Sequence, residues 1–188
     1  MPKVSLFLTI SLMIVTLIVG LGAGYSLTPQ YAQTMYEKNS MGLGAADRWV
    51  DLRYINAMIA HHRGAVLVAQ QAEKSSKRTE IVALAKEIQT NEPVLIKNLY
   101  TLKKQLYNDT APVTDPVIPH LGTADEKFDL RFINVVIAHH LAGIEMTKEI
   151  RSKSSRNEVL NDADAVENFL TGSLKMLKGW RSEWYEVN

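Results

Sequence analysis

Four of the five histidines in this chain stand as two adjacent pairs, His61-His62 and His139-His140. Each pair ends a twelve-residue stretch, residues 51–62 or 129–140, and nine of the twelve positions are identical at a constant offset of 78 residues. Near-identity at a fixed offset indicates two copies of one helical unit that stack on each other. Imidazole is a common metal ligand in proteins, so the repeated pairs are the first candidates for a functional site.

The first histidine pair lies close to a sulfur donor. Met58 precedes His61 by three residues and His62 by four, and residues at those separations are neighbours on a helix surface. Successive residues of a helix point about 100° apart, so the two imidazoles of one pair face different directions. Met58 can therefore share a metal ion with either histidine.

The second pair has different neighbours. Val136 takes the position of Met58, while Glu145 and Met146 follow His139 by six and seven residues. Thioether sulfur selects Cu(I) or Ag(I), whereas imidazole alone also suits Cu(II) or zinc. Two equivalent sites are therefore not expected. The candidate metal ligands are His61, His62, Met58, His139, His140, Met146 and Glu145.

A structural role competes with metal binding at the histidine pairs. Four imidazoles in one bundle cost free energy unless they are hydrogen-bonded or coordinated. Hydrogen bonding alone would make them a buried polar seam or a pH-sensitive interface, so both interpretations stay open. The other repeated polar residues are expected to form a charge and amide network, within or between helices, that fixes the two halves, with a role as metal ligands as the alternative. They are Asp51, Arg53, Asn56, Asp129, Arg131 and Asn134.

Composition and motif spacing exclude several classes of protein. The chain has no cysteine, which excludes disulfides, Cys-ligated zinc and thiol catalysis. Its net charge is +1 and it has no basic stripe, so no nucleic-acid partner is expected. The Glu-x-x-His motif of di-iron bundles, His-Glu-x-x-His, Gly-rich phosphate loops and Gly-x-Ser-x-Gly are all absent. No catalytic residue is nominated, and the protein is not expected to be an enzyme.

Four long helices must position the histidines. Apolar residues recur at three- and four-residue spacing over residues 45–72, 79–107, 123–151 and 157–185. Pro93 predicts a kink or a shift in the second helix near residues 90–92, and Thr123 with Glu126 predicts a capping box at the start of the third. A proline-rich crossover over residues 108–122 separates the halves, 45–108 and 123–187. The predicted fold class is all-α, a four-helix bundle built from two repeated helical hairpins.

An apolar segment precedes the bundle. Residues 4–24 carry no charge, and about 20 such residues are enough for a transmembrane helix. Residues 1–25 are therefore interpreted as a membrane anchor and residues 26–44 as a tether to the bundle, 45–187. A cleavable signal peptide, which would leave a secreted protein, is the alternative. Lys3 precedes the segment, so the positive-inside rule predicts a cytoplasmic amino terminus and an extracytoplasmic bundle, in a periplasm or at the cell surface.

The repeated stretches resemble a known family, the domain of unknown function 305. The resemblance covers residues 47–180 and rests on one motif and four residues of the second copy: Tyr54-x-x-x-Met58-x-x-His61-His62-x-Gly64-Ala65-Val66, and Phe132, His139, His140 and Met146. It implies a ferritin-like four-helix bundle from an exported or membrane-anchored bacterial protein. It also implies copper or silver binding through histidine and methionine, which in some members is linked to metal tolerance.

The chain departs from the family pattern at several donors. Val68 and Val136 replace expected methionines, and the family's Gln-x-x-Glu-Ile corresponds here to Glu92 with Leu95-Ile96 and to Leu170 with Ser173-Leu174. Residues and resemblance together predict an extracytoplasmic, membrane-anchored bundle that binds copper, as Cu(I) or Cu(II), for buffering or tolerance rather than catalysis. Silver and zinc are the alternative ions. The competing prediction is a structural or interaction module that binds no metal.

Overall fold

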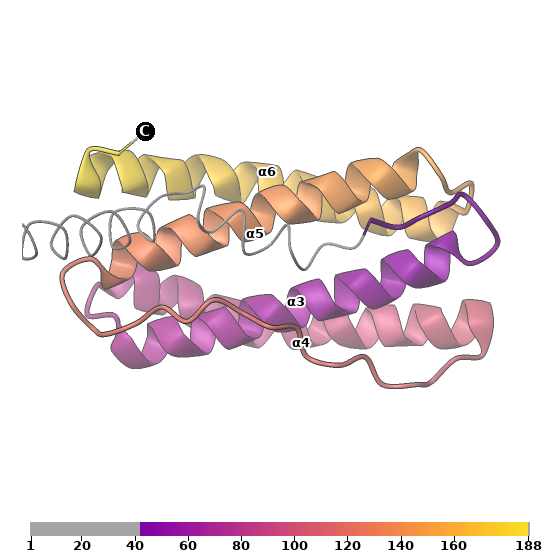
Figure 1. Ribbon diagram of the computed structural model, residues 1–188, viewed down its shortest axis with the longest axis horizontal. Helices are drawn as coiled ribbons and strands as arrows, with labels where there is room; N and C mark the ends of the chain where they lie inside the picture. The colour runs from indigo at the N-terminus through magenta and orange to yellow at the C-terminus, as the bar shows by residue number, and fades with distance from the viewer. Residues whose placement is uncertain (1–41, 188) are drawn as a thin grey trace, which may run out of the picture.

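The computed structural model describes residues 42–187, and these residues form four helices and no strand. The helices are α3 (Val50–Ser75), α4 (Thr79–Tyr107), α5 (Phe128–Arg151) and α6 (Asn157–Tyr185). They lie along one long axis, with α3 and α4 forming one hairpin and α5 and α6 the other (Figure 1). The hairpins pack together through α3 and α5. The all-α prediction is therefore confirmed.

The predicted membrane anchor, residues 1–25, lies outside the described residues, as does the tether up to residue 41. None of the four helices in the described part of the chain combines the length and the apolar character that a bilayer crossing needs.

The second and fourth helices have the predicted bounds. Both follow a residue with extended backbone, Arg78 or Arg156, and both end at a residue in the left-handed conformation, Asn108 or Glu186. A left-handed residue after the last turn stops a helix. α4 is continuous through Pro93, which lacks one helical hydrogen bond because it has no N–H.

The first and third helices begin later than predicted, at Val50 and Phe128. The predicted capping box is wrong, because the Thr123 hydroxyl donates to the Asp125 carboxylate at 3.1 Å instead of capping a helix. Asp125 in turn accepts the amide of Lys127 at 3.0 Å. An aspartate that bonds the backbone two residues on forms a turn that competes with the helix. The helix therefore starts only after this turn.

The repeated arginine fastens that turn to the helix. Arg131 donates from Nε to the carbonyl of Leu121 at 2.6 Å and from Nη2 to the carbonyl of Thr123 at 2.7 Å. Gly122 has a φ of 77°, a conformation that glycine adopts without steric cost and that turns these carbonyls toward the guanidinium. Arg53 makes the same two contacts in the first copy, at 2.5 and 2.6 Å. The repeat thus specifies a loop clamp as well as a helix.

Replacing Arg131 by alanine is expected to lower the free energy of unfolding by about 2 kcal/mol, because two carbonyls and Asp125 lose a charged donor. Urea denaturation of the purified protein measures the change. Lys86→Ala, at an exposed position of α4, is the matched control and should stay within about 0.5 kcal/mol of the wild type. Equal destabilisation by the two variants would contradict the clamp.

The two hairpins are also joined by repeated charges, as predicted. Asp51 on α3 accepts from Arg156 before α6 at 3.1 Å, and Asp129 on α5 faces Arg78 before α4 at 3.8 Å. Each partner lies 78 residues from its counterpart, so one hairpin is related to the other by an approximate twofold axis.

The hydrophobic core follows the same symmetry. Two buried clusters contain residues that correspond to each other at the offset of 78. One cluster includes Val50, Tyr54, Ile55, Met58, Ile59 and Leu99, and the other includes Phe128, Phe132, Ile133, Val136, Ile137 and Leu177. The histidine pairs follow these residues along α3 and α5, so they lie where the two halves meet.

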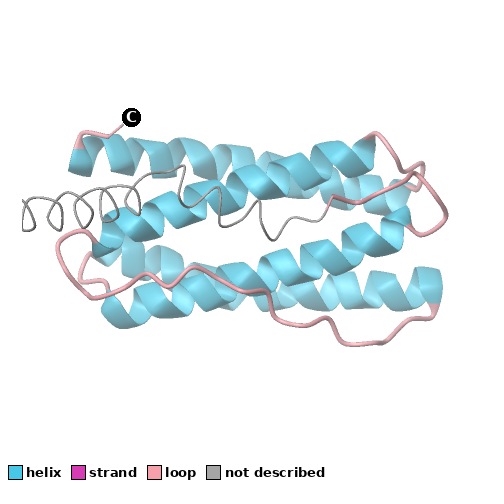
Figure 2. Ribbon diagram, in the orientation of Figure 1, coloured by secondary structure: helices cyan, strands magenta, loops and turns pink. Residues whose placement is uncertain are grey.

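The crossover between the hairpins, residues 108–127, runs along the length of the bundle (Figure 2). The Tyr100 hydroxyl accepts the amide of Val113 at 2.9 Å, and Gln71 donates to the carbonyl of Pro119 at 3.1 Å. This return path makes α5 antiparallel to α3 (Figure 1). Two antiparallel copies of one stretch bring their equivalent positions together near the middle, and those positions are the histidines.

Candidate functional site

Equivalent histidines of the two copies contact each other. The rings of His61 and His139 stack with centroids 3.6 Å apart and an interplanar angle of 18°. His139 also donates from Nε2 to the backbone carbonyl of His61 at 3.0 Å. This contact joins α3 to α5 at the approximate twofold axis.

The second histidine of each pair has a different environment in the two copies. His62 is buried and donates from Nδ1 to the carboxylate of Glu92 on α4. The residue equivalent to Glu92 is Leu170, so His140 faces an apolar side chain at the corresponding place. Both ring nitrogens of His140 are buried and neither has a side-chain partner; the backbone carbonyl of Val136 is the polar group that opposes the lowering of the His140 pKa by burial. The repeat is therefore broken here: a carboxylate orients the ring of His62, and the second copy has a leucine in its place.

A second break in the repeat adds another acid. The Tyr54 hydroxyl on α3 donates to Oδ2 of Asp162 on α6 at 2.8 Å. The equivalent residues are Phe132 and Leu84, which are both apolar. Burial raises the pKa of Asp162, while Tyr54 and His62 oppose that shift. Burial, together with the Asp162 charge, also raises the pKa of Tyr54.

A cavity of about 260 Å³ lies among these groups. All four histidines line it, as do Glu92 and Asp162, and the remaining walls are mostly apolar. Leu95 and Phe169 also line the cavity and are 40% and 59% exposed. The cavity therefore reaches solvent beside α4 and α6.

Burial keeps three of the imidazoles neutral at pH 7. It lowers the pKa of His139 to about 4, and with the neighbouring His139 it lowers the pKa of His140 to about 3. Burial and the other three imidazoles hold the pKa of His61 well below its usual value. A neutral imidazole keeps a lone pair on one nitrogen, which is the form that binds a metal ion.

A glycine on α5 makes room for His61. A Cβ added at Gly143 would lie 2.8 Å from His61 Nε2 and 2.5 Å from Leu170 Cδ1. The equivalent residue in the first copy is Ala65, which lines the cavity. Because Gly143 has no side chain, the backbone of α5 can approach His61 more closely than it could with an alanine at this position, as in the first copy.

The predicted sulfur donors do not line the cavity. Met58 is fully buried in the core cluster that contains Tyr54 and Ile55. Met146 packs on the same cluster from α5. The structure therefore brings together the four predicted histidines but leaves both thioethers outside the cavity.

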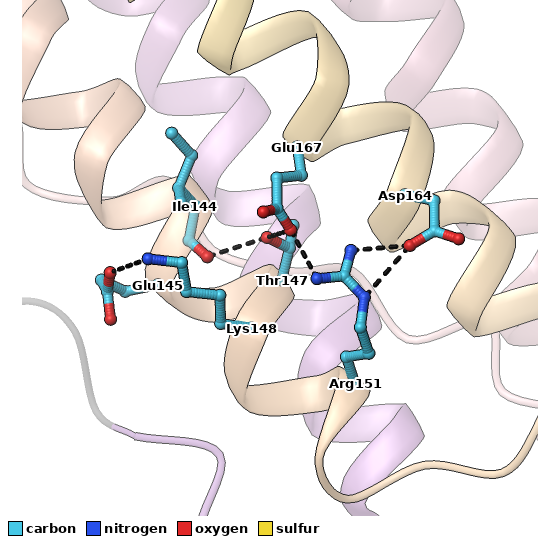
Figure 3. A network of polar contacts seen from close by, with 7 residues as sticks. All are labelled: Ile144, Glu145, Thr147, Lys148, Arg151, Asp164 and Glu167. Atoms are coloured by element: carbon cyan, nitrogen blue, oxygen red, sulfur yellow. Dashed lines mark hydrogen bonds and ion pairs between the residues drawn. The ribbon is translucent and has the colours of Figure 1, made fainter.

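Glu145 is also separate from the histidines. Its side chain is 73% exposed and pairs with Lys148 at 3.0 Å on the surface of α5 (Figure 3). The same view shows Arg151 bridging Asp164 and Glu167 of α6, with Arg151 Nη2 at 2.6 Å from Asp164 Oδ1. The bonds from Arg151 to Asp164 and Glu167 link α5 to α6 on the outside of the hairpin.

Sequence reasoning missed Asp162 and did not nominate Glu92 as a site residue. The repeat contained a signal for both, because each acid stands where the other copy has leucine. A carboxylate in place of an apolar core residue costs free energy, so such a mismatch indicates a position with a special role. Comparison of the two halves position by position would have found them.

The donors around the cavity fit an ion that binds imidazole. Within residues 42–187, no three His, Asp or Glu side chains already converge on one point, so a ligand set would require side-chain rotation. His61 Nε2 and both nitrogens of His140 are nevertheless buried without side-chain partners, which is costly unless something binds them. His62 donates from Nδ1 to a carboxylate, and this orientation leaves the Nε2 lone pair for a metal.

Solved structures with the same architecture hold such ions. "CopM in the Cu(I)-bound form" is 26% identical to this chain, with a TM-score of 0.65 over 73% of this chain and 99% of that one. The Ag-bound form obtained by co-crystallization is 26% identical, with a TM-score of 0.63 over 72% of this chain and 97% of the other. The Cu(II)-bound form is 25% identical, with a TM-score of 0.61 over the same shares of the two chains.

Comparison of the sequence with known families gives one match. No curated protein sequence matches the chain. The model of the family described as "Domain of unknown function (DUF305)" matches residues 28–103 and 51–127, which together span more than half of the 188 residues. On this match, which agrees with the resemblance of the histidine motif, the chain belongs to the DUF305 family.

Proposed function

We propose that this protein binds a copper-class metal ion in the cavity between its two His-His helices. Binding serves to buffer the ion or to give tolerance to it, and no catalytic step is assigned. The ligands are drawn from His61, His62, His139 and His140.

The observation that carries this proposal is the group of buried imidazole nitrogens without side-chain partners. His61 Nε2 and the two nitrogens of His140 lie in the wall of a cavity rather than in a packed core. Each such atom costs about 1–3 kcal/mol when it is left unsatisfied. A bound ion would remove that cost, and the low pKa values of His139 and His140 mean that little proton competition remains at pH 7.

Similarity to CopM supports copper or silver as the ion. CopM has been solved with Cu(I), Cu(II) and Ag, and it shares 25–26% of its residues with this chain in those forms. The proposal departs from the sequence prediction in its ligands, because Met58 and Met146 lie in or against a core cluster outside the cavity.

The proposed location is outside the cytoplasm, with the chain anchored in a membrane. Support comes from the uncharged segment of residues 4–24 and from Lys3 before it. Metal buffering by an anchored bundle would then act on ions before or after they cross the membrane.

One contact favours a purely structural role for two of the histidines. His139 donates to the carbonyl of His61, and the two rings stack, so this pair contributes to the α3–α5 interface without any ion. The polar-seam interpretation is therefore the second candidate, and it predicts that no histidine is needed to bind metal.

The test measures binding of Cu(I), Cu(II) and Zn(II) to the purified full-length chain by competition with chelators. We expect micromolar or tighter binding that is lost when all four cavity histidines are changed to alanine. His120→Ala is the control, because this exposed histidine accepts the amide of Gly122 in the crossover and should not affect binding.

A single variant guards against loss of the fold. His140→Gln removes an imidazole that has no side-chain hydrogen-bond partner, so the variant should keep the helical circular dichroism of the wild type and bind metal more weakly. Absence of binding by the wild type, or equal binding by the wild type and the four-histidine variant, would refute the metal proposal and leave the polar seam.

A further inference from the structure

The hydrogen-bonded pair of Tyr54 and Asp162, beside the cavity, breaks the twofold repeat. In one half, Tyr54 on α3 reaches Asp162 on α6. In the other half, the same two positions hold Phe132 and Leu84, which need no hydrogen bond. The fold therefore does not require a polar pair here, because the second copy packs with apolar side chains.

A structural explanation of Asp162 is incomplete. Burying a carboxylate costs more free energy than one neutral hydrogen bond returns, and the copy with phenylalanine and leucine avoids that cost. Asp162 also lines the cavity, next to its contact with Tyr54. Tyr54 donates to Oδ2, which leaves Oδ1 as the oxygen available to a ligand in the cavity.

On the assumption of the proposed function, we infer that Asp162 is an oxygen ligand of the bound ion and that Tyr54 is its positioning residue. The pair makes the cavity select a divalent ion of the Cu(II) or Zn(II) class over Cu(I) or Ag(I).

The chemistry of the donors gives the direction of this selectivity. Carboxylate oxygen is a hard donor that favours divalent ions, while Cu(I) and Ag(I) favour thioether sulfur. The two candidate sulfur donors, Met58 and Met146, are outside the cavity, so the soft ions have no sulfur ligand there. A full negative charge in a partly buried site also stabilises a 2+ ion more than a 1+ ion.

The neighbouring histidine fits the same ion. His62 lies close enough to Asp162 to influence the pKa of that carboxyl, and both side chains line the cavity. Glu92 accepts the Nδ1 proton of His62, and Tyr54 donates its hydroxyl proton to Oδ2 of Asp162. His62 and Asp162 thus each have one partner outside the ligand set that fixes the orientation of the side chain, as is usual around protein-bound metals.

The experiment compares Asp162→Asn with the wild type as full-length proteins. Asparagine keeps the size of the side chain and can still accept from Tyr54, so the fold should be retained. We expect Cu(II) and Zn(II) affinities to fall about tenfold or more, and Cu(I) affinity to change by less than about threefold. Asp164→Asn, on the outer face of α6, is the matched control and should leave all three affinities unchanged.

Tyr54→Phe tests the positioning role with a spectroscopic readout. The change reproduces the side chain of the second copy, and we expect it to alter the Cu(II) electron paramagnetic resonance spectrum in the same direction as Asp162→Asn. A change in stability alone would leave that spectrum as in the wild type and would overturn the role of Tyr54.

The outcomes separate this inference from the proposed function. Loss of binding in the four-histidine variant with wild-type Cu(II) affinity in Asp162→Asn would overturn the inference and keep the metal proposal. Equal losses for Cu(I) and Cu(II) in Asp162→Asn would also overturn it, because a hard donor discriminates between them. Absence of metal binding by the wild type would refute both.

Discussion

Lowering the pH from 7 to 5 is expected to reduce the stability of this bundle by about 4 kcal/mol through His139 and His140 alone. The pKa of these imidazoles is about 4 and about 3 in the folded protein, against 6.5 in the unfolded chain. Below pH 6.5 the unfolded chain therefore binds protons that the folded protein does not, so stability falls as the pH falls. At pH 5, about 1.5 pH units below the unfolded pKa, each histidine contributes about 2 kcal/mol of destabilisation.

Urea denaturation at pH 7, 6 and 5 measures this loss, which is a large fraction of the roughly 5–15 kcal/mol that stabilises an ordinary domain. His140→Gln should reduce the loss of stability between pH 7 and 5 by about 2 kcal/mol, because glutamine does not titrate. His120→Ala changes an exposed histidine and should leave the profile as in the wild type. A profile that is flat between pH 7 and 5 would mean that these imidazoles are accessible to protons in the folded state.

Replacing Glu92 by leucine is expected to weaken metal binding about 10- to 100-fold, the range found when a carboxylate that orients a metal-ligating histidine is removed. His62 would lose the acceptor of its Nδ1 proton, and with it the fixed orientation of Nε2. The fold should tolerate the change, because Leu170 occupies the equivalent position beside His140. Competition titrations with Cu(II) and Zn(II) measure the affinity of the variant.

Glu87→Leu provides the comparison for this variant. Glu87 is exposed on the same helix, five residues earlier, so its replacement adds the same apolar side chain without touching the cavity. Wild-type affinity is expected for it. If Glu92→Leu binds metal as tightly as Glu87→Leu does, His62 is not a ligand and its bond to Glu92 is structural.

Periodicity predicted the helices well where tertiary contacts do not compete with it. The bounds of α4 and α6 follow from the apolar spacing and from the ends of the repeat. The starts of α3 and α5 were predicted too early, because Asp47 and Asp125 bond the backbone two residues ahead and form turns. Helix propensity contains no information about the arginine clamp that stabilises those turns.

The candidate site was predictable in part. The four histidines come together because two antiparallel copies of one stretch meet at their middle. The repeat indicated that the two copies stack, but it did not give their relative direction. The role of Met58 was harder to judge, because residues four apart share a helix face but differ by about 6 Å along the axis. That rise places Met58 in a core cluster while His62 lines the cavity. The sequence pattern predicts the direction in which a side chain points from the helix axis better than it predicts the position of that side chain along the axis.

Asp162 and Glu92 make contacts that the spacing of apolar residues cannot predict. Asp162 and Glu92 belong to helices far from the histidines in sequence, and their partners are fixed only by the packing of the four helices. A comparison between the halves still contains the signal, since a leucine in one copy and an acid in the other cannot both be explained by core packing.

If the bundle binds metal as proposed, the broken symmetry also limits how many ions it holds. In a cavity with true twofold symmetry, every position away from the axis would occur twice, and a bound ion would either exchange between the two positions or be joined by a second ion. Here only one His62–Glu92 pair and one Tyr54–Asp162 pair exist, so the two positions differ in energy. On the proposed function, we therefore expect one tightly held divalent ion per chain, in a protein whose sequence repeats twice.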